Sequence, residues 1–162
     1  PAQALIELND ALSADIQAGL YVTMLYVIID VRTHEIVLAR AGHELPLFVR
    51  RDPGHGISVA EFVGSEGMAL GMVPTAIFAE AIREQVEPFR SGDAVVLYTD
   101  GLTEAPNEED REFSGARLAD AARAFHAKTP REINDAILEA VTRFTGDTAQ
   151  RDDFTLVTVK RG

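Results

Sequence analysis

The chain has 162 residues, a formal net charge of −11 and no cysteine. This length suits about one domain with a core of its own. The missing cysteines exclude disulfides and thiolate metal sites, and the negative charge argues against nucleic acid and anionic membranes as partners. No apolar run approaches the roughly 18 residues of a membrane span, and no signal-peptide pattern opens the chain. We therefore expect a cytoplasmic protein with no membrane segment in this domain.

The first predicted element is an amphipathic helix over residues 2–14. Ala2, Leu5, Leu8 and Leu12 fall near one face at helical spacing. The chain begins at Pro1 without a methionine, directly before this helix. We therefore expect a fragment, a processed product or an excised piece that had further sequence before it.

Strands and tight turns dominate the middle of the chain. A β-branched and aromatic run predicts a strand at 21–31, and a turn at 32–35 leads into a second strand at 36–40. The remaining predictions of this stretch are a strand at 45–50, a turn at 52–56, a strand at 57–63 and a strand at about 79–87.

The last third alternates between buried strands and helices. Five apolar or aromatic residues inside 93–99 predict a strand that is buried on both faces, and 154–159 predicts the final strand. A helix is expected over about 114–126. A second helix begins at the capping box Thr129-Pro130-Arg131-Glu132 and ends at Gly146. Hairpins in the middle and helices at both ends predict an α+β fold with antiparallel sheet.

Acidic residues stand where two of these apolar strands end. Asp100 directly follows the strand at 93–99, and Gly101 lets the backbone turn sharply beside it. Asp152 and Asp153 directly precede the strand at 154–159. If the two strands are neighbours, their acidic ends meet, and carboxylate oxygens are the ligands that Mg²⁺ and Mn²⁺ prefer. The alternative is that each aspartate serves only as a turn residue or a cap.

The segment from Gly92 to Ala105 closely resembles the central signature of the bacterial PP2C-like (PPM) serine/threonine phosphatases. The branch concerned is typified by sporulation and stress-response sigma-factor regulators. Smaller matching pieces occur in the family's order along essentially the whole chain. They are Asn9 in Leu-Asn-x-x-Leu, Tyr21–Tyr26, Ala41-Gly42-His43, Leu70-Gly71, the variant Phe113-Ser114-Gly115, and Gln150–Thr155 with its Asp-Asp-x-Thr pattern.

The resemblance implies a sandwich of two antiparallel β-sheets flanked by helices, with two Mn²⁺ or Mg²⁺ ions at one end. Asp100 and Asp152 would be metal ligands, Asp153 a third with a less defined role, and Thr99, Gly101 and His43 would line the site. The implied reaction is hydrolysis of phosphoserine or phosphothreonine by metal-activated water, with no catalytic residue beyond the metal ligands. The substrate would be a phosphorylated bacterial regulator such as an anti-anti-sigma factor, and an upstream sensor domain would control the parent protein.

One part of the family pattern is absent. Relatives carry an N-terminal strand pair with a metal-binding Asp, followed by Asp-x-x-Gly-His-Gly, before the first helix of this chain. Residues 1–162 are therefore expected to be one N-terminally truncated phosphatase domain that lacks its first strands. The remaining aspartates would make half of a site, holding one ion or none. Missing strands expose sheet edges and favour self-association, such as a homodimer.

Several other features have simpler interpretations. Asp52-Pro53-Gly54-His55-Gly56 looks like the missing motif, but its position and its Pro-Gly pair favour a hairpin turn. His43 is expected to fix its own turn, and His126 to end a helix whose dipole favours a cation. The acidic run from Glu104 to Glu112 is expected to be a solvated loop, or alternatively a flap that selects substrates by charge.

Two functions of different class remain at this point. The first is a metal-dependent protein phosphatase domain, and the second is a catalytically silent sensing or interaction module on the same fold. A third alternative is an unrelated α+β domain, which would leave Asp100 and Asp152 far apart in space.

Overall fold

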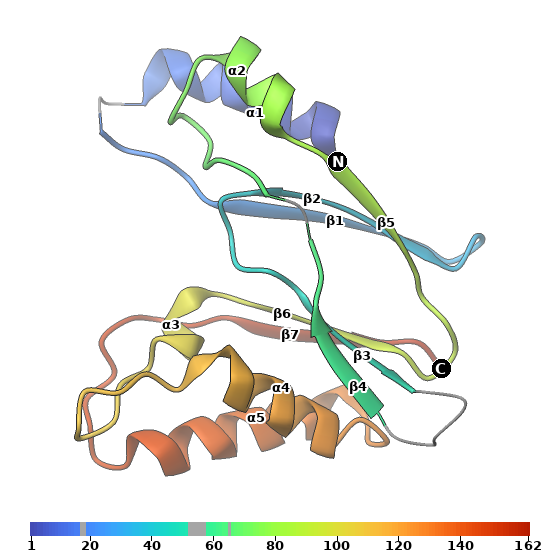
Figure 1. The fold of residues 1–162 in the computed structure, drawn as a ribbon, viewed down its shortest axis with the longest axis vertical. Helices are drawn as coiled ribbons and strands as arrows, with labels where there is room; N and C mark the ends of the chain where they lie inside the picture. The colour runs from blue at the N-terminus through green and yellow to red at the C-terminus, as the bar shows by residue number, and fades with distance from the viewer. Residues whose placement is uncertain (17–18, 52–57, 65) are drawn as a thin grey trace. The chain divides into compact units, whose positions relative to one another are not determined.

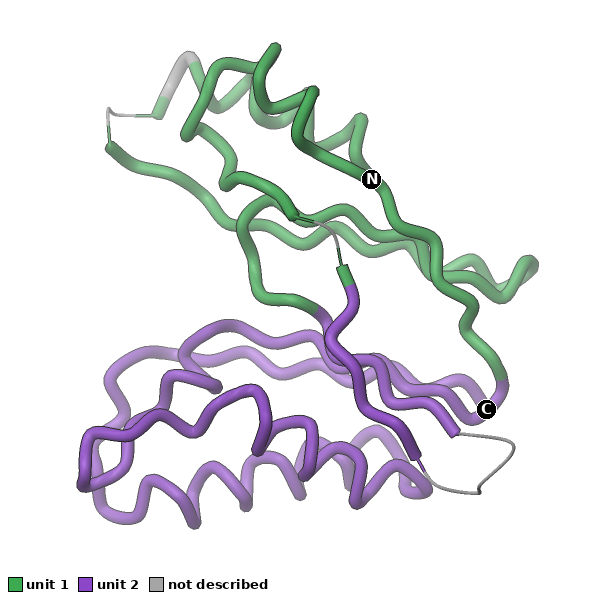
Figure 2. The backbone as a smooth tube through the Cα atoms, viewed as in Figure 1, with its two compact units in different colours: residues 1–45, 64–90 green, residues 46–63, 91–162 purple. Residues whose placement is uncertain are grey.

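The computed structural model describes residues 1–16, 19–51, 58–64 and 66–162. The chain forms two compact units, shown in different colours in Figure 2. Unit 1 comprises Pro1–Leu45 and Gly64–Arg90, and unit 2 comprises Pro46–Val63 and Ser91–Gly162. Each unit contains one antiparallel sheet with helices (Figure 1). No helix in the described ranges is long and apolar enough to cross a membrane.

Unit 1 is a three-stranded sheet with two helices. Its elements in chain order are α1 (Ala2–Asp15), β1 (Met24–Asp30), β2 (Glu35–Ala41), α2 (Thr75–Ala81) and β5 (Glu84–Pro88). The strand order is β1-β2-β5. β1 and β2 form the predicted hairpin, in register from Met24 opposite Ala41 to Asp30 opposite Glu35.

The core of unit 1 forms where α1 and α2 pack on the sheet. Leu5 of α1 and Phe78 of α2 are fully buried in one cluster with Ala39, Ala41 and Leu70. The predicted helix over 2–14 is therefore confirmed, because its apolar face has a partner to cover.

Unit 2 is a four-stranded sheet with three helices. Its elements are β3 (Leu47–Arg51), β4 (Ser58–Phe62), β6 (Ala94–Tyr98), α3 (Asp100–Thr103), α4 (Ser114–Ala124), α5 (Pro130–Thr145) and β7 (Leu156–Lys160). The strand order is β4-β3-β6-β7. Figure 1 shows α4 and α5 side by side on one side of this sheet.

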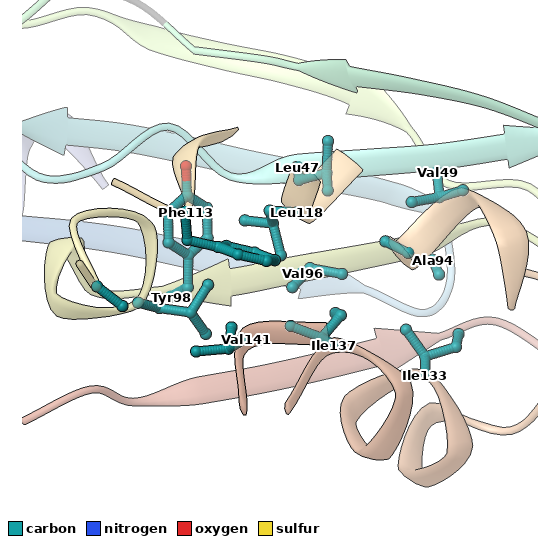
Figure 3. Close-up of a cluster of buried hydrophobic side chains, with 13 residues drawn as sticks. Leu47, Val49, Ala94, Val96, Tyr98, Phe113, Leu118, Ile133, Ile137 and Val141 are labelled. Carbon is teal, nitrogen blue, oxygen red and sulfur yellow. The ribbon is translucent and has the colours of Figure 1, made fainter. Parts of the chain in front are cut away.

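The core of unit 2 lies between this sheet and the two long helices. Figure 3 shows Val96 and Tyr98 of β6 facing Leu118 of α4 and Ile137 of α5. α5 begins with the predicted capping box, because the Thr129 hydroxyl accepts the Glu132 N–H and the Glu132 carboxylate accepts the Thr129 N–H. Apolar spacing and capping therefore agree on where α5 lies.

One predicted element is wrong in part. The sequence predicts a strand over about 79–87, whereas the structure has helix α2 over Thr75–Ala81 and a strand only at Glu84–Pro88. The fixed φ of Pro74 suits the N-terminal end of a helix, and Phe78 gains full burial in the α1–α2 core. The turn predicted at 52–56 lies outside the described residues.

The predicted fold class is confirmed: the chain is α+β, with two antiparallel sheets and helices. The other predicted strands and helices are present with ends shifted by a few residues. β1, for example, begins at Met24 rather than at Tyr21.

Candidate active site

The end of β6 and the start of β7 lie at the same edge of the unit 2 sheet. The two strands pair antiparallel, from Ala94 opposite Lys160 to Tyr98 opposite Leu156. The pairing continues for one more step, because Thr99 N donates to Thr155 O at 3.2 Å and Thr155 N donates to Thr99 Oγ1 at 2.9 Å. The residues that follow Thr99 and precede Thr155 are therefore brought together, although they are about 50 positions apart in sequence.

Gly101 shows how closely these two segments approach. A Cβ placed on Gly101 would lie 2.7 Å from the carbonyl oxygen of Asp153 and 3.4 Å from the Cβ of Asp152. Only glycine allows this approach without a shift of the backbone. Asp100 and Asp152 therefore sit on adjoining segments, and Asp100, Asp152 and Asp153 are called the acidic rim below.

The three residues of the acidic rim are exposed, and short local bonds hold the carboxylates of Asp100 and Asp152. Asp100 Oδ1 accepts the Gly101 N–H at 2.9 Å, and Asp152 Oδ1 accepts the Asp153 N–H at 2.8 Å. Among the described residues, neither Oδ2 has a hydrogen-bond partner. Each of these two carboxylates is therefore oriented through one oxygen on an exposed residue.

Exposed carboxylate oxygens on adjoining segments match the donors that Mg²⁺ and Mn²⁺ prefer, since such ions often take one or two carboxylates and keep several waters. Within the described ranges, no three His, Asp or Glu side chains are grouped so that they could hold a metal ion. The acidic rim therefore offers part of a coordination shell, with hard oxygen donors and no histidine or thiolate.

A pocket of about 380 Å³ opens beside the acidic rim within unit 2. Gly101 and Asp152 belong to both the pocket wall and the rim segments. The other walls come from the loop after α3, the end of α5 and residues 148–151. Sequence patterns do not predict this pocket, because its walls come together only when β6 pairs with β7 and α5 packs on the sheet.

The acidic run is an ordered loop, and residues 104–112 are called the acidic loop below. Pro106 bridges to Glu112, and Asn107 Oδ1 accepts the N–H groups of Glu109 and Arg111 at 3.1 and 2.9 Å. Asp110 Oδ1 lies 2.6 Å from the Arg151 guanidinium. An ion pair thus joins the acidic loop to the segment that carries Asp152. The charges of the loop and of that segment, each taken alone, do not predict this contact.

The two histidines with expected roles, His43 and His126, bond to groups outside the acidic rim. His43 lies in unit 1, where its ring nitrogen is 3.4 Å from the Glu44 carbonyl and its own carbonyl accepts from Arg40 at 2.7 Å. This is the turn-fixing role expected from the sequence. Its placement near the metal site stays a prediction.

His126 differs from the expectation of a helix-end cation. Its ring is buried and its Nδ1 lies 2.7 Å from Ser58 Oγ. Burial lowers the pKa of His126 below its ordinary value. Desolvation therefore outweighs the helix dipole here, and the neutral ring is favoured.

The sequence profile of the stage II sporulation protein E (SpoIIE) matches residues 1–162, and the chain belongs to this family of PP2C-type phosphatases.

Known proteins resemble the chain along nearly its whole length. It is 25% identical over 161 residues to the phosphoserine phosphatase RsbU of Bacillus subtilis, covering 99% of this chain and 45% of RsbU. The crystal structure of the RsbU and RsbW domains of Rv1364c from Mycobacterium tuberculosis matches with a TM-score of 0.73 and 27% identity. That match covers 99% of this chain and 41% of the other.

A third match shows the same fold. The Mn-presoaked structure of the phosphatase domain of the cell fate determinant SpoIIE from Bacillus subtilis has a TM-score of 0.67 and 20% identity, covering 98% of this chain and 65% of that one. The chain spans less than half the length of the curated relatives that it matches.

Proposed function

We propose that this chain is part of a metal-dependent protein phosphatase domain that hydrolyses phosphoserine or phosphothreonine. The observation that carries the proposal is the meeting of Asp100 and Asp152 at one sheet edge, with Gly101 packed against Asp152 and Asp153. Membership of the SpoIIE family and the similarity to a phosphoserine phosphatase support the reaction class.

Asp100 and Asp152 would hold a hard dication, Mn²⁺ or Mg²⁺, through the oxygens that face solvent, with Asp153 beside them. When bound, the ion would neutralise the phosphoryl charge and lower the pKa of a coordinated water. The chain itself orients the two carboxylates through the N–H groups of Gly101 and Asp153. Thr99 holds the two rim segments in register through its hydroxyl. The Mn-presoaked SpoIIE structure supports the choice of ion by analogy of fold.

The proposed substrate is a phosphorylated bacterial regulatory protein, such as an anti-anti-sigma factor. Two observations support it: the similarity to RsbU, and the solved relative that joins an RsbU domain to an RsbW domain in one chain. We also propose that an upstream regulatory domain controls the activity.

The test measures Mn²⁺ affinity by calorimetry and Mn²⁺-dependent release of phosphate from a phosphoserine peptide. It uses this chain and the parent protein. We expect Asp100→Asn and Asp152→Asn to weaken Mn²⁺ binding at least tenfold and to abolish turnover by the parent, because each removes a charged ligand. Asp147→Asn, which changes an exposed aspartate outside the rim, is the matched control. Unchanged turnover in Asp100→Asn would exclude the proposed metal site.

A catalytically silent module is the second candidate, and one observation favours it. The described residues hold no group of three metal-ligating side chains. If neither this chain nor its parent binds Mn²⁺ while both fold, the silent module is the better description.

A further inference from the structure

We propose that the pocket beside the acidic rim binds a cationic side chain, arginine or lysine, of the protein substrate next to its phosphorylated residue. That this side chain belongs to a phosphorylated protein substrate rests on the proposed function. The pocket's preference for a cation rests on its own walls.

The size and apolar walls of the pocket suit one long side chain. Its volume of about 380 Å³ lies at the small end of ligand pockets. Ala105, Val141 and Phe154 contribute apolar surface to the walls. Arginine and lysine cover such surface with their methylene stems while the charged end reaches polar groups.

The charge of the walls selects a cation. Four carboxylates line the pocket, from Glu104, Asp110, Glu112 and Asp152, against one guanidinium from Arg151. Arg151 is already engaged with Asp110 at 2.6 Å, which shows that this wall accepts a guanidinium. A phosphate or a carboxylate would be repelled here, so the pocket does not duplicate the site proposed for the phosphoryl group.

Two hydroxyl groups of the walls, those of Thr142 and Thr145, are arranged as acceptors. Thr142 Oγ1 donates its hydrogen to Leu138 O at 2.9 Å, and Thr145 Oγ1 donates to Thr142 O at 3.3 Å. Their remaining lone pairs can only accept. Thr148 Oγ1 is buried and has no hydrogen-bond partner among the described residues. Ammonium and guanidinium groups carry only donors, so they complement such walls, whereas neutral amides and alcohols do so less well.

The location connects the pocket to catalysis. Asp152 and Gly101 belong to both the pocket wall and the rim segments. A cation held in the pocket would therefore lie beside the phosphoryl group held at the rim. The acidic loop then acts as a specificity element, which corresponds to the flap that the sequence analysis gave as the alternative to a solvated loop.

The experiment titrates this chain with four capped amino acids, N-acetyl amides of arginine, lysine, citrulline and norleucine, and follows backbone amide shifts by NMR without metal. We expect the arginine and lysine amides to shift residues 104–112 and 142–151. The uncharged citrulline and norleucine amides should bind at least tenfold more weakly. Glu112→Gln should weaken the binding of the cationic ligands severalfold, since an exposed charge pair contributes modestly.

Two matched variants complete the design. Glu139→Gln removes an exposed carboxylate on α5 that pairs with Arg143 and does not line the pocket, so it should leave binding unchanged. Asp100→Asn should also leave it unchanged, because Asp100 is no part of the pocket wall. The experiments can therefore contradict the proposal for the pocket while the phosphatase proposal stands. They can equally contradict the phosphatase proposal while the proposal for the pocket stands.

Equal binding of citrulline and arginine amides would overturn the proposal, as would binding that Glu112→Gln leaves at full strength. Absence of shifts with every ligand would overturn it as well. In the parent protein, the same preference predicts faster turnover of a phosphoserine peptide with a neighbouring arginine than of its citrulline counterpart.

Discussion

Two polar sites of the molecule are built in opposite ways. In unit 1, Asn9 is fully buried, and its side chain donates to Val73 O and Thr75 Oγ1 at 3.3 and 3.2 Å and accepts from Gly71 N at 2.9 Å. In unit 2, the residues of the acidic rim are exposed, and Asp100 and Asp152 each use a single oxygen to accept a neighbouring N–H.

The difference separates a polar group that supports the fold from polar groups to which we assign a function. A buried amide must satisfy its hydrogen-bonding groups inside the protein, or it destabilises the fold. Asn9 does so by fixing α1 to the segment 71–75. The rim carboxylates leave bonding capacity toward solvent, which contributes little to stability and is available to a ligand.

The largest expected effect on stability comes from Asn9→Ala. The change removes three buried hydrogen bonds and leaves the Gly71 N–H without its partner, which outweighs the better helix propensity of alanine. We expect a loss of about 2–3 kcal/mol in the free energy of unfolding, measured by urea denaturation. Gln3→Ala, at an exposed position of the same helix, should stay within about 0.5 kcal/mol. Equal effects of both variants would contradict the structural role of Asn9.

The next largest effect is expected at the acidic rim, from Gly101→Ala. Gly101→Ala would place its Cβ 2.7 Å from the Asp153 carbonyl, so the two rim segments must separate. We expect at least a tenfold loss of Mn²⁺ affinity by calorimetry, with a destabilisation of about 1–3 kcal/mol from the added atom. Gly162→Ala, where a Cβ meets open space, is the control. Wild-type metal affinity in Gly101→Ala would show that the close approach is irrelevant to binding.

The smallest expected effect concerns pH. Burial is the largest cause that lowers the pKa of His126; Lys160 and Arg51 lower it further, while the Gly92 backbone and Asp93 raise it. Below pH 6.5 the unfolded chain therefore takes up a proton that the folded chain resists. Stability should be constant above pH 6.5 and fall as the pH drops below it.

Thermal unfolding between pH 7.5 and 5.5 measures this loss. His126→Gln should flatten the decline in that range. His34→Asn should not, because His34 is exposed in a turn at φ +64°, a conformation that asparagine tolerates. An unchanged decline in His126→Gln would assign the acid sensitivity to other groups.

Sequence patterns predicted the parts of the molecule that depend on local chemistry. The capping box at Thr129 and the buried strand before Asp100 each place an element by themselves. The hypothesis that the two strands of the rim are neighbours was based on two apolar runs, one followed by an acidic residue and the other preceded by acidic residues. The residues of α2 were misassigned in part, because a short apolar segment fits a strand or a helix until its tertiary partners are known.

The pocket lay beyond sequence reasoning for a different reason. Its walls come from the acidic loop and from 141–154, and no spacing in the chain relates these stretches. The Arg151–Asp110 pair likewise joins residues that are 41 positions apart. In the sequence, Arg151 stands before two aspartates and has no feature that distinguishes it from other surface charges. Only the structure shows that the acidic loop lies next to it.

Within the described sheet, β7 has one strand neighbour, which is β6. The backbone pairing with β6 therefore sets the register of β7 in the sheet. On the helix side, the Thr158 hydroxyl donates to Asn134 Oδ1 of α5 at 2.5 Å. A mispairing by one residue would reverse which side chains point inward along β7, and Asp152 would lose its place beside Gly101. The Thr158 hydroxyl, in the middle of an edge strand of the described sheet, thus helps to hold the register that positions carboxylates with which it has no contact.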